Sequence, residues 1–97
     1  MTDQETIDRA VRQSQHRLDQ IVTNTKNDFR SFGEMVRTSG LSNDQLELQL
    51  DRLEQRMDVR LNGVNLLRRH RNEFREFVNG KRAVCEEFRE YLNDHKL

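Results

Sequence analysis

The sequence predicts an all-α protein: two long antiparallel helices forming a coiled-coil-like hairpin, followed by a third helix at the C-terminal end. Three observations lead to this prediction. Apolar residues recur every three or four positions, which is the spacing of one helix face. Turn-forming and sheet-forming residues are scarce, because the 97 residues include four Gly, no Pro, no Trp and one Tyr. Charged residues make up 35% of the chain against 33% hydrophobic, which favours elongated amphipathic helices over a large globular core.

The first helix is expected over residues 3–38. Asp3 and Glu5 suit the positive end of a helix dipole, and no Pro interrupts the rest of this segment. The core-facing stripe comprises Ile7, Val11, Ser14, Leu18, Ile21, Val22, Thr25, Phe29, Phe32 and Val36. Its mean step is about 3.6 residues, which is one helical turn. Because the stripe includes a Ser and a Thr, we expect a weak seam.

A turn is expected over residues 39–42, where Gly40 stands among Ser and Thr residues. Ser42 and Gln45 have the spacing of a capping box, in which each side chain accepts a hydrogen bond from the other residue's backbone N–H. A connection this short folds the second helix back against the first.

The second helix is expected over residues 43–78, with its most regular heptad pattern between Leu46 and Met57. Apolar residues on this stripe and its continuation are the ones that we expect at a helical interface. They are Leu46, Leu50, Leu53, Met57, Leu61, Val64, Leu67, Phe74, Phe77, Phe88 and Tyr91.

Two continuations are open at Asn79–Gly80. Asn-Gly is a turn signal, whereas the apolar spacing from Phe74 to Phe88 passes through it in register. A break would give two helices of about 54 Å each, followed by a third over residues 81–95. Without a break the second helix would reach about 75 Å. We favour a break or kink, within a single helical domain spanning residues 1–97.

No residue pattern indicates catalysis or cofactor binding. His16, His70 and His95 lack the spacing that places two metal ligands on one helix face. No Gly-rich phosphate loop or nucleophile motif is present. The single cysteine, Cys85, lies on the apolar stripe and is expected to be a small buried side chain. We therefore expect no enzyme, no catalytic residue, no metal site and no cofactor.

The segment 60–82 holds seven basic and two acidic residues, a net charge of +5 in a chain whose formal net charge is zero. Arginine guanidinium groups suit carboxylates and phosphates. At about 100° per residue, Arg68, Arg69 and Arg71 sweep about 300° of the helix, so we do not expect them to face one surface. The expected basic patch comprises Arg68, Arg69, Arg71, Arg75, Lys81 and Arg82.

These features predict a non-enzymatic helical interaction or scaffold protein that self-associates or forms a subunit of a larger coiled-coil assembly. Leu48, Val59 and Leu66 lie off the main stripe and would stay exposed in a two-helix hairpin, so protein partners or further copies are expected to cover them. The alternative is a small regulator that binds nucleic acid, or a nucleic-acid enzyme, through residues 60–82.

The N-terminal residues lack the basic and apolar regions of a signal peptide, and no apolar run approaches the roughly 18 residues of a membrane span. We therefore expect a cytoplasmic protein without a transmembrane segment.

Overall fold

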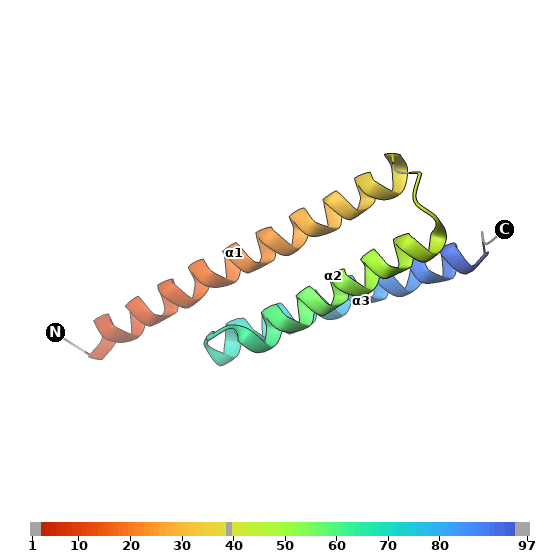
Figure 1. The fold of residues 1–97 in the computed structure, drawn as a ribbon. Coiled ribbons are helices and arrows are strands. Elements are labelled where there is room, and N and C mark those ends of the chain that lie inside the picture. The colour runs from red at the N-terminus through yellow and green to blue at the C-terminus, as the bar shows by residue number, and fades with distance from the viewer. Residues whose placement is uncertain (1–2, 39, 95–97) are drawn as a thin grey trace.

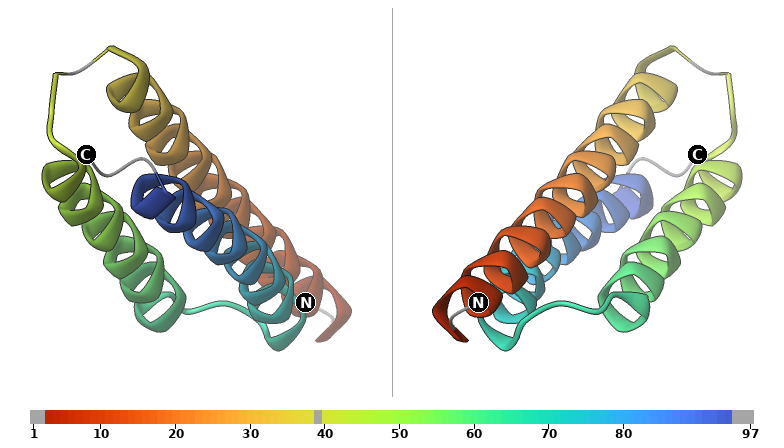
Figure 2. Two further views of the ribbon diagram at one scale, coloured as in Figure 1. Left: turned by 90° about the vertical axis from the view of Figure 1, so that its right-hand side faces the viewer. Right: turned by 90° about the vertical axis from the view of Figure 1, so that its left-hand side faces the viewer.

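The computed structural model describes residues 3–38 and 40–94 and shows an elongated bundle of three helices (Figure 1). The helices are α1 (Asp3–Thr38), α2 (Asn43–Gly63) and α3 (Arg68–Asp94). α2 runs antiparallel to α1 and α3, and each helix contacts the other two (Figure 2). The predicted all-helical class is confirmed. The arrangement differs from the predicted hairpin, because the chain folds back twice within the described residues.

The inner face of α1 is the predicted stripe, of which Ser14, Leu18, Thr25 and Phe32 are buried. The first buried residue is Ser14, whereas residues 3–10 are exposed. Figure 1 shows why: the N-terminal part of α1 projects beyond the connection between α2 and α3. We call residues 3–13 the α1 overhang, and it is about 16 Å long at 1.5 Å per residue.

The start of α2 confirms the predicted capping box. The Ser42 Oγ accepts a hydrogen bond from the Gln45 backbone N–H at 3.3 Å, and the Gln45 Oε1 accepts one from the Ser42 N–H at 3.0 Å. These bonds satisfy donors that have no partner inside the helix. Of the predicted turn 39–42, residue 39 lies outside the described residues.

The second helix was predicted over residues 43–78, and its predicted end is wrong. α2 stops at Gly63, and residues 64–67 form a connection in which Val64 has extended backbone angles, φ −106° and ψ 130°. Asn62–Gly63 is an Asn-Gly pair, the same turn signal as Asn79–Gly80. Stopping here allows Leu66, at 7% exposure, to enter the core instead of staying exposed as expected.

The predicted break at Asn79–Gly80 is also wrong, because α3 continues through it. Both residues are exposed on the outer face of α3, so water can satisfy the polar side chain of Asn79 without a break in the helix. Their poor helix propensity costs about 1 kcal/mol, which the buried residues on either side outweigh. Residues 81–95 are therefore no separate helix, and residue 95 itself lies outside the described residues.

The core runs along the axis between the three helices. Its buried cluster comprises Leu18, Phe32, Leu50, Leu53, Met57, Leu66, Phe74, Val78 and Cys85. Cys85 has no exposed surface, which confirms the prediction of a buried cysteine. The Phe32 and Phe88 rings meet edge to face at 5.3 Å and join α1 to α3.

Gly80→Ala is expected to raise the free energy of unfolding by about 1 kcal/mol, because Gly80 lies inside α3 and an added Cβ meets no atom within 4 Å. Thermal unfolding should shift upward by roughly 4–8 °C for a domain of this size. Gly63→Ala, at the last residue of α2, is the control and should gain less. Destabilisation by Gly80→Ala would contradict a continuous α3.

Candidate interaction site

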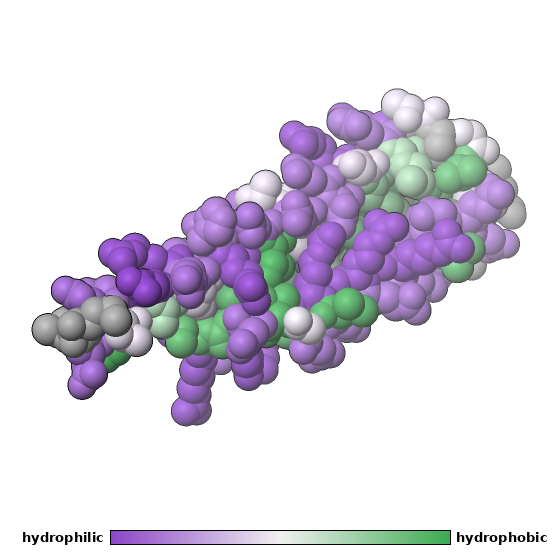
Figure 3. All heavy atoms as spheres, turned by 60° about the vertical axis from the view of Figure 1, so that its left-hand side comes forward, coloured by the Kyte–Doolittle hydropathy of each residue, from purple (hydrophilic) through white to green (hydrophobic). Residues whose placement is uncertain are grey.

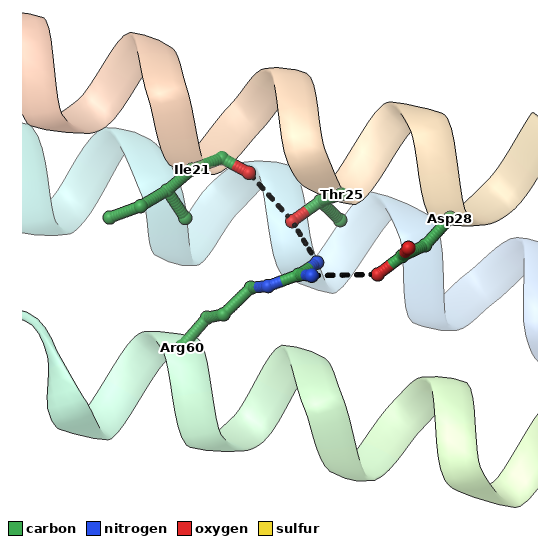
Figure 4. Close-up of polar contacts among 4 residues, drawn as sticks. All are labelled: Ile21, Thr25, Asp28 and Arg60. Carbon is green, nitrogen blue, oxygen red and sulfur yellow. Dashed lines mark hydrogen bonds and ion pairs between the residues drawn. The ribbon is translucent and has the colours of Figure 1, made fainter.

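Arg60 of α2 bonds to side chains of α1 within the bundle (Figure 4). Its guanidinium group donates to the Thr25 Oγ1 at 3.0 Å and to the Asp28 carboxylate at 2.7 Å, which ties α2 to α1. The Thr25 hydroxyl in turn donates to the Ile21 carbonyl at 2.9 Å. This explains a polar residue on the inner stripe of α1, because Thr25 is fully buried yet both its donor and its acceptor are occupied.

Two residues of the predicted basic patch, Lys81 and Arg82, contact other side chains at the partly exposed edges of the bundle. Arg82 pairs with Asp58 of α2, and one heptad later Arg89 pairs with Asp51 and Glu54 of the same helix. The Lys81 ammonium group lies over the Phe29 and Phe77 rings, at 5.1 and 5.4 Å from their centroids. Both predicted residues therefore contribute to packing between helices.

The other four residues of the predicted patch, Arg68, Arg69, Arg71 and Arg75, are exposed. Within residues 3–38 and 40–94 none of them forms an ion pair. Arg75 precedes Arg82 by one heptad, and the antiparallel register brings it towards the end of α2, where Asn62 and Gly63 carry no charge. We call these four residues the arginine end.

Arg68, Arg69 and Arg71 do not all face one surface of α3, as expected, although three of the four arginines share one side of the helix. A sweep of about 300° returns to within about 60° of its start, so Arg68 and Arg71 lie on one side of α3. Arg75 lies between them in angle, and Arg69 alone lies on the other side. The arginine end also coincides with the N-terminus of α3, whose first turn holds no acidic residue. Its positive charge therefore adds to that of the helix dipole.

A polar junction fastens α1 to the start of α3. The Ser14 Oγ lies 2.6 Å from the His70 Nδ1 and accepts from the Leu67 backbone N–H at 3.0 Å. The Arg69 guanidinium lies 3.3 Å from the His70 Nε2. Because Arg can only donate, Nε2 is the acceptor and the Nδ1–H donates to Ser14. In this tautomer His70 offers no base to the Ser14 hydroxyl, so the pair suits positioning and not nucleophilic catalysis.

Ser14→Ala is expected to lower the free energy of unfolding by about 2 kcal/mol. The substitution leaves the Leu67 N–H and the buried His70 ring without their acceptor, and unsatisfied buried polar groups are costly. Urea unfolding measures the change. Ser31→Ala, at an exposed position of the same helix, is the control and should be neutral or slightly stabilising. Equal effects of the two substitutions would contradict a structural role for the junction.

Most residues predicted at an interface belong to the chain's own packing. The buried ones are Leu46, Leu50, Leu53, Met57 and Phe74. Those partly buried against the core are Leu61, Val64, Phe77 and Phe88. Leu67 and Tyr91 are 40% and 52% exposed, so these two present apolar surface to the outside. An intermolecular interface at these positions stays a prediction.

The α1 overhang was not expected from the sequence. Ile7 and Val11 were assigned to the seam between two helices, yet Ile7 is 54% exposed and Val11 is half-buried. A groove of about 550 Å³ lies at the base of the overhang, between α1 and the α2–α3 connection, and its lining includes Ala10, Ser14 and Leu67. Figure 3 shows this end of the molecule, where polar side chains surround a band of apolar atoms.

In the described part of the chain, no three His, Cys, Asp or Glu side chains gather as metal ligands would. None of the three helices combines the length and hydropathy that crossing a membrane requires. Comparison with protein-family models, with curated proteins and with solved structures gives no match.

Proposed function

We propose that the chain is a helical interaction module that binds another helix along the α1 overhang, either by self-association or as a subunit of a larger coiled-coil assembly. The observation that carries this proposal is the open inner face of the overhang. Ile7, Val11 and Leu18 lie within about 40° of one another around α1, but residues 3–10 are exposed, Val11 is half-buried and full burial on this face begins at Ser14.

The overhang is suited to binding because it is already helical. A free peptide of this length would be marginally helical in water, whereas here the helix is nucleated by the rest of α1. A second helix therefore meets an ordered apolar face, and less conformational entropy is lost on binding.

Substitution of Ile7 tests this function. Affinity capture with the native chain is expected to recover one or more helical proteins, or further copies of the chain, and Ile7→Glu should abolish the capture. Val59→Glu is the matched control, because Val59 is 70% exposed on the outer side of α2, away from the overhang. Capture of the same proteins by all three chains would contradict binding along the overhang.

A second candidate function is binding to nucleic acid, or to a nucleic-acid enzyme, through the arginine end. The observation that favours it is the set of four exposed arginines without ion pairs in the described structure. Binding to phosphates should weaken steeply between about 50 and 200 mM salt. Arg68→Glu combined with Arg71→Glu should abolish it, and the exposed pair Arg52→Glu and Arg56→Glu on α2 serves as the control of equal charge.

A further inference from the structure

We infer that the occupant of the α1 overhang is the overhang of a second copy of this chain, packed antiparallel in a two-fold symmetric dimer. The inference rests on the proposed function and deepens it, because it names the partner. It depends on three properties of the overhang: its apolar face, its charge distribution and its length.

The apolar face is self-complementary in the antiparallel orientation. Ile7, which is exposed, and Val11, which is half-buried, are one helical turn apart on the same face of α1. Two antiparallel overhangs can therefore place Ile7 of each copy against Val11 of the other, and symmetry makes this contact twice. Because both overhangs are about 16 Å long, each tip then reaches the end of the other bundle. Leu67, which is 40% exposed, lies at that end.

The charges favour the same orientation. The tip of the overhang is acidic, with Asp3, Glu5 and Asp8, whereas the half next to the bundle carries Arg9 and Arg12. In the register that pairs Ile7 with Val11, position 9 lies on the two-fold axis, and antiparallel packing brings Arg12 of one copy beside Glu5 of the other. Parallel packing would set like charges side by side.

The arginine end extends this complementarity. The acidic tip of one copy arrives at the N-terminus of the other copy's α3, where Arg68 and Arg69 have no carboxylate partner within the described residues of their own chain. The helix dipole adds positive charge at the same place. The dimer thus gives these arginines an acidic partner that the described part of the monomer does not supply.

The small size of the contact predicts a weak dimer. Two overhangs of about 16 Å bury less surface than the roughly 1,200 Å² at the lower bound of standard interfaces. We therefore expect a dissociation constant in the micromolar range or above, and an association that weakens as salt screens the charges.

Sedimentation velocity of the purified chain between about 5 and 500 μM, at about 50 mM salt, tests the inference. The native chain is expected to shift from monomer to dimer over this range. Ile7→Glu should weaken the association at least tenfold, whereas Val59→Glu should leave it unchanged. Circular dichroism checks that each variant keeps its helical content, which is expected because both positions are exposed.

Charge exchange between two variants tests the orientation. The tip variant carries Asp3→Lys and Asp8→Lys, and the end variant carries Arg68→Glu and Arg69→Glu. Each alone sets like charges against each other and should dimerise at least tenfold more weakly than the native chain. In an equimolar mixture the introduced lysines of the tip variant meet the introduced glutamates of the end variant, and the native Asp3 and Asp8 of the end variant meet the native Arg68 and Arg69 of the tip variant. Native mass spectrometry should therefore find mainly heterodimers.

Several results would overturn the inference. One is a chain that stays monomeric up to 500 μM, and another is a mixture that associates no better than its separate components. Tight, salt-sensitive binding of random duplex DNA by the monomer, abolished in the end variant, would assign the arginine end to a polyanion instead. If the chain is monomeric but captures a different helical protein through Ile7, the second copy is excluded while the proposed function stands.

Discussion

Leu53→Asp is expected to unfold the bundle, lowering the free energy of unfolding by about 4 kcal/mol or more. Leu53 lies in the middle of α2, is 3% exposed and belongs to the core cluster shared by all three helices. An aspartate there would bury a carboxylate without a partner or force the helices apart, and either outcome is costly. Loss of the cooperative transition in urea or thermal unfolding, followed by circular dichroism, would show the effect.

Two controls separate this burial effect from the substitution itself. Leu48→Asp introduces the same charge into the same helix at a residue that is 50% exposed, and it should change stability by less than about 1 kcal/mol. Leu53→Met nearly preserves the volume and should cost less than about 1.5 kcal/mol. If Leu53→Asp unfolded like the native chain, Leu53 would not belong to the core.

The burial pattern was predictable wherever a helix face repeats. The stripes of α1 and of Leu46–Met57 were found because a spacing of three and four residues reflects which side chains a helix can bury together. The Ser42–Gln45 capping box was found for a similarly local reason, since both partners lie within one turn. The burial of Cys85 was predictable from its place on the stripe of α3.

The position of the second fold-back was not predictable from local signals. Asn62–Gly63 and Asn79–Gly80 are identical pairs, but α2 ends at the first and α3 passes through the second. The difference lies in tertiary packing. Ending α2 at Gly63 brings Leu66 into the core and sets the Leu67 N–H against Ser14, about fifty residues earlier in the chain. A break at Gly80 would gain no comparable contact.

The basic segment shows the same limit of local reasoning. The excess positive charge of this segment is evident from the sequence. Which of its residues form ion pairs within the bundle depends on the other helices. Arg60 finds Asp28 on α1, and Arg82 finds Asp58 on α2, neither of which is close in sequence. Among residues 3–38 and 40–94 the arginine end has no such partner, because α2 stops before it. The overhang was missed for a related reason, since its exposure results from the shortness of α2 and not from any property of residues 3–13.

The stability of the protein is expected to fall as the pH rises from about 9 to about 11, and removal of the Cys85 thiol should abolish this part of the pH dependence. Burial raises the pKa of the Cys85 thiol from its ordinary value of 9.0 to about 11, and the charge of Glu54 acts in the same direction. Between these values the unfolded chain has lost the thiol proton while the folded chain keeps it. The contribution is therefore fully present below pH 9 and is lost as the pH approaches 11, amounting to about 3 kcal/mol.

Cys85→Val isolates this effect, because Lys and Tyr residues that also titrate above pH 9 are present in both chains. The valine should fold in place, since an apolar cavity of about 120 Å³ lined by Phe29, Leu50 and Phe88 adjoins Cys85. Urea unfolding at pH 8, 9, 10 and 11 gives the free energy of each chain. We expect the difference between the native chain and Cys85→Val to widen steadily above pH 9 in favour of the variant. Parallel curves would mean that the Cys85 thiolate is tolerated in the core, which the packing of the three helices around it argues against.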